Sequence, residues 1–305
     1  MDAIKRALLE QVADLHGVPE GAYNVRANGR ADGRRTTANI DIVSKTDKDG
    51  IDIIIKENTK NESVHIPVII SESGLSDLVY NDFYIGDGAD VTIIAGCGIH
   101  NCGDQTSRHD GIHTFHVGRD ARVRYVERHY GEEEGTGENV MNPTTVINIA
   151  EGGYMEMETT QIKGIDSTIR VTRATLAEKA TLVVKEKIMT HGKQFAETEF
   201  EVDLNGSGSS ANVISRSVAK DDSRQKFLSR INGNSECYGH TECDAIIMDN
   251  ASVCAIPEIT ANDINATLIH EAAIGKIAGE QLIKLMTLGL TEKEAEEQIV
   301  NGFLK

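Results

Sequence analysis

The sequence contains no tryptophan, and aromatic residues make up only 4 % of its 305 residues. Proline is also scarce, with four residues, whereas glycine is abundant, with 28. This composition is typical of many short strands joined by glycine or asparagine turns, and it fits a conventional helical enzyme less well. A chain of this length builds an adequate core without disulfides or metals, as one large elongated domain or two ordinary ones.

Positive charge is in short supply, because 31 Lys and Arg face 48 Asp and Glu and leave a net charge of −17. Such a chain repels nucleic acid and anionic membranes, so we expect neither as a partner. No apolar run approaches the roughly 20 residues of a membrane span. The five cysteines form an odd set, and the start "MDAIKRALLEQ" lacks a signal-peptide apolar region. We therefore expect free thiols and a cytoplasmic protein.

A recurring phrase runs through residues 35–260, in which a turn and a small residue precede alternating side chains. Its copies are "GADVTII", "DARVRYV", "EGGYMEM", "KATLVVK", "SSANVIS" and "NASVCAI", aligned on Ala89, Ala121, Gly153, Ala180, Ala211 and Ala251 at intervals of 32, 32, 27, 31 and 40 residues. The second and fourth residues after each small one are mostly apolar, which predicts strands with one buried face. Because no amphipathic helix separates the copies, we expect a mainly β fold of stacked β-solenoid coils.

Helical patterns occupy the two ends of the sequence. Residues 1–16 place Ile4, Leu8, Val12 and Leu15 on one helical face. Beyond residue 265, one helix is expected to end at Gly289, and a second to open with a capping box between Thr291 and Glu294 and to stop at Gly302. We thus expect an N-terminal helix and lead-in over 1–34, the solenoid over 35–264 and a helical region over 265–305.

Cys243 precedes the pair His270-Glu271 by 27 and 28 residues, about one coil of the repeat. Residues one coil apart in a solenoid stack at roughly the 4.8 Å strand spacing, so a thiolate and an imidazole can share a metal there. Such a donor set suits iron or zinc. The alternative is a buried cysteine beside a surface helix cap.

A second cluster of donors is "GCGIHNCGDQTSRHDGIHTFHVG", which contains Cys97, His100, Cys102, His109, His113 and His116. If 112–117 is a strand, His113 and His116 face opposite sides and cannot share one ion. The candidates are a metal site or, alternatively, ordinary loop and core histidines. Farther along, Cys237 and Cys243 should share one strand face with His240 on the other, and Cys254 should lie on an outer face, as an accessible thiol or an inert small residue.

Glycine-rich pieces such as "AAIGK" lack the order of a phosphate-binding loop, and His270 stands at its first glycine position. We therefore expect this chain to bind no nucleotide.

The segment "HEAAIGKIAGEQLIKLMTLGLTEKEAEEQIVNGFL" closely resembles the C-terminal signature of the SufB/SufD family of iron–sulfur cluster assembly scaffolds, and a weaker likeness extends through "SRINGNSECYGHTECDAIIMDNASVCAIPEI" to about residue 35. The resemblance implies a right-handed parallel β-helix with a terminal helical part. It also implies a short, minimal member, because the larger N-terminal region of the family is missing.

By this resemblance, Cys243 and Glu271, with His270 beside them, are implicated in holding a nascent iron–sulfur cluster, as in SufB-type members. Ile269 replaces the acidic residue that precedes His-Glu in many SufB members. The family's partner is a SufC-type ABC ATPase, docking here at about 272–303, which includes Ile274, Lys276, Leu282, Leu285, Met286 and Phe303.

The resulting expectation is a non-enzymatic scaffold, a homodimer that works with the ATPase and with a cysteine desulfurase or other sulfur donor. Cys97, Cys102, Cys237, Cys254, His100 and His113 are weaker candidates for sulfur relay or metal binding. The alternatives are a stand-alone β-helix metalloenzyme that uses the 97–116 segment and a SufD-like structural adaptor that binds no cluster.

Overall fold

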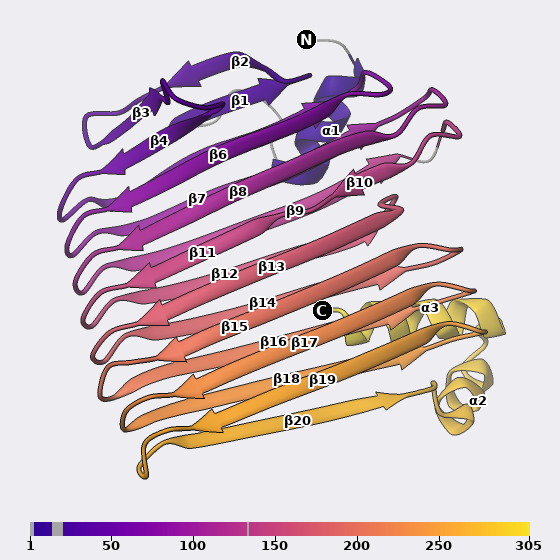
Figure 1. Ribbon diagram of the computed structural model, residues 1–305. Coiled ribbons are helices and arrows are strands. Elements are labelled where there is room, and N and C mark those ends of the chain that lie inside the picture. Colours follow the sequence, from indigo (N-terminus) through magenta and orange to yellow (C-terminus); the bar gives the residue numbers. More distant parts are fainter. Residues whose placement is uncertain (1–2, 14–20, 133) are drawn as a thin grey trace.

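The computed structural model describes residues 3–13, 21–132 and 134–305, and over these residues the chain winds into stacked coils (Figure 1). Most coils contribute one strand to each of two facing sheets. The first, sheet A, contains in spatial order β2 (Arg30–Arg35), β1 (Ala22–Ala27), β5 (Lys60–Ile70), β7 (Asp90–His100), β9 (Arg122–Glu132), β12 (Tyr154–Lys163), β14 (Thr181–Thr190), β16 (Ser209–Ala219), β18 (Cys237–Ile247) and β20 (Thr267–Gly275).

Sheet B contains in spatial order β19 (Ser252–Ala261), β17 (Arg224–Gly233), β15 (Phe195–Leu204), β13 (Ser167–Leu176), β10 (Asn139–Met141) with β11 (Thr144–Ile149) on the same rung, β8 (Ser107–Val117), β6 (Ser76–Ile85), β4 (Gly50–Ile55) and β3 (Ile40–Ser44). Neighbours pair in parallel, apart from the antiparallel pairs β1–β2 and β3–β4 among the described strands. The prediction of a mainly β solenoid of stacked coils is confirmed.

Side-chain alternation places the core between the two sheets. On β14, Leu182 and Val184 are fully buried, whereas Val183 and Lys185 face outward. Equivalent side chains of successive coils stack on one another, as the parallel rings of Phe83 and Phe115 do at 4.3 Å between centroids. The stacked rows form one continuous core. Burial of each large apolar side chain there stabilises the fold by about 1.5–3 kcal/mol.

The small residues of the repeat lie just after tight turns, at the N-terminal ends of the strands of sheet A. Gly88 and Gly152 adopt positive φ, and Asp120 and Lys179 adopt left-handed conformations at the equivalent places. A residue in this conformation reverses the chain, and the next amide closes the turn, as Ala89 N–H does on the Gly86 carbonyl. The turn therefore needs a small inward residue next.

The strand register corrects the last two positions of the predicted repeat. Leu182 pairs with Ala211, so Ser209, not Ala211, is the counterpart of Ala180. Because the displacement is two residues, the predicted inward faces on β16 remain right.

The last predicted copy, around Ala251, precedes β19 and therefore belongs to sheet B. Cys237 and Ala266 occupy the repeat position in the last two coils, since β18 pairs with β16 and with β20 in these registers. A cysteine at this position does not match the alanine–glycine pattern, which hides the true period.

The N-terminal helix, α1 (Ala3–Ala13), lies against the outer side of sheet A. Its residues Leu8 and Val12 are fully buried and pack with Val25 and Ile69. Gly96 of β7 permits this contact, because a Cβ there would lie 2.7 Å from the Val12 carbonyl oxygen. Leu15 of the predicted helical face lies outside the described residues, as does the side chain of Ile4.

Two helices follow the last coil, α2 (Gly279–Thr287) and α3 (Glu292–Phe303). The predicted capping box between Thr291 and Glu294 is present. Gly289 follows α2 with φ of +99°, as expected, but α3 continues through Gly302 to Phe303, so the predicted stop at Gly302 is wrong. Capping by the chain beyond Gly302 sets this end, because Leu304 N–H bonds to the Val300 carbonyl.

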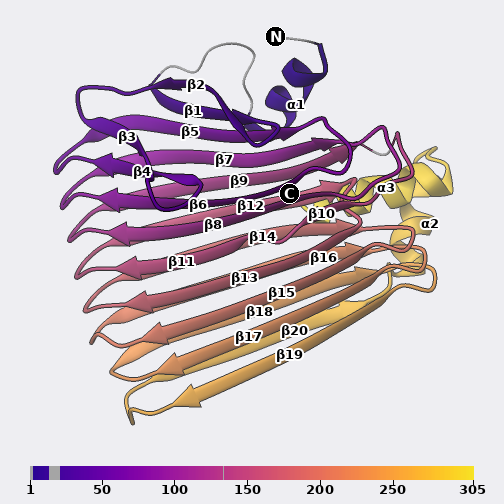
Figure 2. The same cartoon turned by 45° about the horizontal axis from the view of Figure 1, so that its top comes forward.

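Helix α3 packs beside the solenoid through Val300 and Leu304, which contact Val218 of β16. Figures 1 and 2 show both helices flanking the strand ends of the last coils, while the face of the final coil stays open. The strands run from Ala22 to Gly275, beyond both ends of the 35–264 span predicted for the solenoid. None of the described helices is long and apolar enough to cross a bilayer.

Candidate functional site

Cys243 lies on β18, one strand from the free edge of sheet A, and its thiol points into the interior with 1 % of the residue exposed. His270 of β20 faces the same interior, where its Nδ1 lies 3.4 Å from the Thr241 hydroxyl. The site therefore sits at the last, half-open coil, where a buried thiol and an imidazole share one face.

The Cys243 thiol is held in its protonated form. Burial raises the pKa of Cys243 to about 12, and the nearby carboxylates of Glu186 and Asp244 add to the shift. Burial lowers the pKa of His270, and His240 acts in the same direction. Both groups are thus neutral at pH 7, the state in which an imidazole can bind metal but a thiol must first lose its proton.

Glu271 lies on the opposite side of sheet A from Cys243. In the β18–β20 register Cys243 pairs with Ala272 and Glu242 with Glu271, so Glu271 projects outward with 65 % of its side chain exposed. We expected one coil to bring the thiol, imidazole and carboxylate together. The structure places Cys243 and His270 on one face, without Glu271. Strand alternation separates the carboxylate from them.

The structure places a different donor set around Glu271. One ligand atom each of His240, Glu242 and Glu271 lies within 4.8 Å of the others, the one group of three such donors found in the described residues. His240 Nε2 is 3.1 Å from Glu271 Oε2, and its Nδ1 is 2.9 Å from Asn212 Oδ1. Sequence reasoning assigned no role to His240 or Glu242, although their alternation with Cys243 was the signal that could have found them.

A row of polar side chains occupies the interior between Cys97 and Cys243. Arg170, 1 % exposed, donates to Glu127 at 2.5 Å and lies 3.5 Å from Glu186. Glu186 in turn accepts from Ser215 at 2.7 Å, and Ser215 is the cross-strand neighbour of Cys243. Burial raises the pKa of Glu186 despite the adjacent Arg170. Buried charged and polar side chains thus extend through the interior of the solenoid as far as the neighbour of Cys243.

The candidate donor residues of the 97–116 segment do not share one face: some side chains are buried and others are exposed. Cys97 is buried, and burial raises its pKa well above the usual value, whereas Cys102 is exposed. His100 Nδ1 contacts Glu132. His113 points inward, where burial lowers its pKa to about 4, and His116 points outward. The predicted opposition of the two histidines is confirmed, and within the described chain the segment brings no three donors together.

The remaining cysteines lie as the alternation predicts. Cys237 is buried on the same face of β18 as Cys243, and burial raises its pKa. Cys254 is exposed on the outer face of β19. Cys237 and Cys243 are therefore interior thiols and Cys254 a surface thiol.

Comparison with known proteins gives the family. Residues 76–303 match the model of the SUF system FeS cluster assembly SufBD core domain, three quarters of the chain. The chain belongs to the SufBD family. An iron–sulfur cluster assembly SufBD family protein of Methanocaldococcus jannaschii is 28 % identical over 83 % of this chain and 79 % of its own length.

Two further SufBD relatives are 30 % identical. That of Methanothermobacter thermautotrophicus aligns over 78 % of this chain and 57 % of its own length, and that of Archaeoglobus fulgidus over 74 % and 60 %. The chain thus spans under two thirds of these two relatives.

The SufBD core match includes the C-terminal helices, whose apolar side chains are unevenly covered. Ile274 and Met286, predicted to bind a partner, are 39 % and 42 % exposed, and Lys276 is exposed. Leu282, Leu285 and Phe303 are half-buried. Sequence reasoning missed the two most exposed large apolar residues after β20, Ile283 at 63 % and Leu288 at 76 %, because helical spacing does not show which face a neighbour covers.

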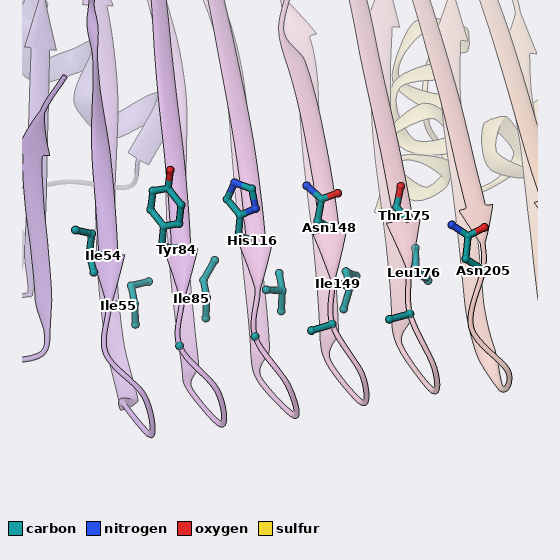
Figure 3. Close-up of a pocket in the computed structure, with 15 residues that line it drawn as sticks. Ile54, Ile55, Tyr84, Ile85, His116, Asn148, Ile149, Thr175, Leu176 and Asn205 are labelled. Carbon is teal, nitrogen blue, oxygen red and sulfur yellow. The ribbon is translucent and has the colours of Figure 1, made fainter. Parts of the chain in front are cut away.

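A surface groove of about 600 Å³ lies on sheet B, far along the chain from Cys243. Outward side chains of successive strands line it in a row, from Ile54 and Tyr84 through His116 to Asn205 (Figure 3). The rings of Tyr84 and His116 stack at 5.0 Å. Its lining is largely apolar and contains none of the cysteines of this SufBD chain.

Proposed function

We propose that this chain is a scaffold on which a nascent iron–sulfur cluster is assembled and passed on. The observation that carries the proposal is the pair of Cys243 and His270 on one interior face at the open end of a SufBD solenoid. A cysteine thiolate is the usual ligand of such clusters, and an imidazole can take a second position. Ligation by one thiolate and weaker donors suits a site that must release its cluster.

Glu271 projects from the opposite side of sheet A and would join this site only through a movement of the edge strand that carries it. It lies on β20, whose outer edge has no strand partner among the described residues. A shift of β20 alone would change the position of Glu271 relative to Cys243, because β18 is held separately by its pairing with β16. We therefore place the working ligand set at a movable edge.

The proposed source of that movement is a SufC-type ABC ATPase bound to the helical region. Helix α2 begins four residues after β20 ends, so a force on the helices reaches β20 directly. Ile274, Lys276, Leu282, Leu285, Met286 and Phe303 are the predicted contacts, to which we add the exposed Ile283 and Leu288. Nucleotide would belong to this partner, not to the scaffold.

Sulfur would come from a cysteine desulfurase or another donor. Cys97 and Cys102 remain candidates for its passage, and the buried polar row through Arg170 lies in the interior between Cys97 and Cys243. Cys237, Cys254, His100 and His113 have the weaker claim. A second copy of the chain would cover the open final coil and complete the working homodimer.

Anaerobic reconstitution with iron, sulfide and the ATPase tests the proposal. Cys243→Ser should abolish the cluster absorbance and the Mössbauer signal, because Cys237, the other interior thiol of β18, lies six residues away, about 20 Å along the strand. Glu271→Gln and His270→Ala should reduce cluster yield. Cys254→Ser, which removes a surface thiol on β19, the next strand along the chain, is the matched control and should assemble normally, because free sulfide needs no relay thiol.

If Cys243→Ser and Glu271→Gln both assemble clusters as the parent does, the chain is a structural adaptor for the ATPase instead. Far-ultraviolet circular dichroism of each variant shows whether the solenoid is intact. A folded Cys243→Ser protein with a normal cluster would refute the scaffold role.

A further inference from the structure

The outer face of both sheets pairs opposite charges on neighbouring coils. Lys185 bonds to Glu156 at 2.6 Å, and Arg230 bonds to Glu258 at 2.6 Å. Carboxylates that face each other directly across strands repel one another. Where that occurs, between Asp52 and Asp82, the ammonium of Lys45 lies between them and bonds to both.

Glu242 and Glu271 break this pattern. They face each other directly across β18 and β20, yet in the described part of the chain no Lys or Arg forms an ion pair with either. Their close neighbours are His240, whose side chain is 16 % exposed, and Asp244, which hydrogen-bonds to Glu242; Arg216 is near enough to attract Glu242 but forms no ion pair with it. Two carboxylates and an imidazole thus converge without the cation that bridges the comparable acidic pair.

Asn212 fixes the orientation of the imidazole. Its Oδ1 accepts from the Nδ1–H of His240 at 2.9 Å, which directs Nε2 at Glu271 Oε2, 3.1 Å away. An unprotonated Nε2 and a carboxylate oxygen are both acceptors, so this contact calls for a proton or a cation between them. Metal-binding histidines commonly have this arrangement, with the second ring nitrogen held by an oxygen and the first free for the metal.

We propose that His240, Glu242 and Glu271 form a ferrous-iron loading site on the outer face of sheet A. Imidazole and carboxylate donors suit Fe²⁺, and three protein ligands leave open positions for water or an incoming ligand. Glu242 precedes Cys243, and Glu271 precedes its partner Ala272, so the iron is held directly behind the thiol across the sheet. This inference rests on the proposed function, for which it names the place where iron, as cargo, first binds.

The exposed Glu271 carboxylate is the movable arm of the site. The three donor atoms lie within 4.8 Å of each other, and metal–ligand bonds of about 2.0–2.2 Å require separations of about 3.0–3.6 Å, so one side chain must move inward. The side chain of Glu271 is 65 % exposed and free to rotate inward, whereas His240 is fixed by Asn212. Because Glu271 belongs to the edge strand, the shift proposed for β20 would also open this site.

Anaerobic titration of the full chain with Fe²⁺ against a competing chelator, and with Co²⁺ as a spectroscopic probe, tests the inference. We expect one tight equivalent, weakened at least about tenfold by His240→Ala or Glu242→Gln and about tenfold by Asn212→Ala. The matched controls His116→Ala and Glu199→Gln, on outer faces elsewhere, should bind as the parent does. The Co²⁺ spectrum should lack a thiolate charge-transfer band.

Cys243→Ser separates this inference from the proposed function. It should keep full Fe²⁺ affinity while losing cluster assembly. Equal binding by every variant would mean adventitious carboxylate binding only and would overturn the site. Loss of Fe²⁺ binding in Cys243→Ser, with normal binding by His240→Ala and Glu242→Gln, would also overturn it but leave the cluster scaffold standing.

Discussion

At the scale of single residues, burial decides which thiols react. Cys102 and Cys254 are exposed, whereas Cys243 is buried and its pKa is raised to about 12. At pH 8 the thiolate fraction of Cys243 is then about one in ten thousand, against about one in ten for a thiol at the ordinary 9.0. A protein that needs this thiolate as a ligand must first open the site.

We predict that iodoacetamide modifies Cys102 and Cys254 quickly and Cys243 very slowly at pH 8, as peptide mass spectrometry would measure. The Cys243 rate should rise about tenfold per pH unit up to about pH 12. The folded state keeps this proton to higher pH than the unfolded chain, so the group's contribution to stability is complete below pH 9 and is lost as pH rises above it. Addition of the ATPase with ATP should accelerate the modification of Cys243 alone. An unchanged rate of Cys243 modification would argue against an opening of the site.

Alternation along a strand allows the sequence to predict which residues share a face, but not which distant residues meet. The opposed directions of His113 and His116 follow from spacing alone. Glu127 and Arg170 are 43 positions apart, and their contact depends on irregular coil lengths. The same irregularity puts Glu271, not His270, opposite Glu242, so alternation can place His240 and Glu242 on one outer face but cannot show that Glu271 joins them.

At the scale of elements, the C-terminal helices present one buried and one open face. Val300 and Leu304 of the α3 end pack on the solenoid, while Ile283 of α2 and Leu288 beyond it are exposed. Their amphipathic pattern and the capping box made the helices predictable. The packing that divides the faces is tertiary and therefore was not.

We predict that Ile283→Glu with Leu288→Glu weakens binding of the ATPase at least about thirtyfold, the effect of losing about 2 kcal/mol at an interface hot spot. Stability should change little, within about 0.5 kcal/mol, because neither residue is buried in the chain. Calorimetric titration and urea unfolding measure the two effects. Ile169→Glu, 45 % exposed on β13, is the control; equal weakening by it would place the interface elsewhere.

At the scale of the whole molecule, the two ends of the solenoid differ. The antiparallel pairs β1–β2 and β3–β4 finish the first coils. At the other end β19 and β20 are the outermost strands, and interior-facing side chains such as Leu268 are half-buried. An uncovered last coil offers unpaired backbone groups and apolar surface to another chain. A second copy, which presents the same surface, is the partner that such an end favours.

We predict a dimer in sedimentation equilibrium that Leu268→Lys or Ile274→Lys converts to monomer, because each places a charge on the open end. Leu78→Lys, 44 % exposed on β6, is the matched control and should remain dimeric.

Two chains of net charge −17 repel, so the dimer should tighten as salt rises from about 0.01 to 0.15 M and the screening length shortens. A folded Leu268→Lys protein, verified by circular dichroism, that dimerises like the parent would show that the open end is not the interface; a dimer weakened by salt would show that ion pairs, not apolar contact, hold it.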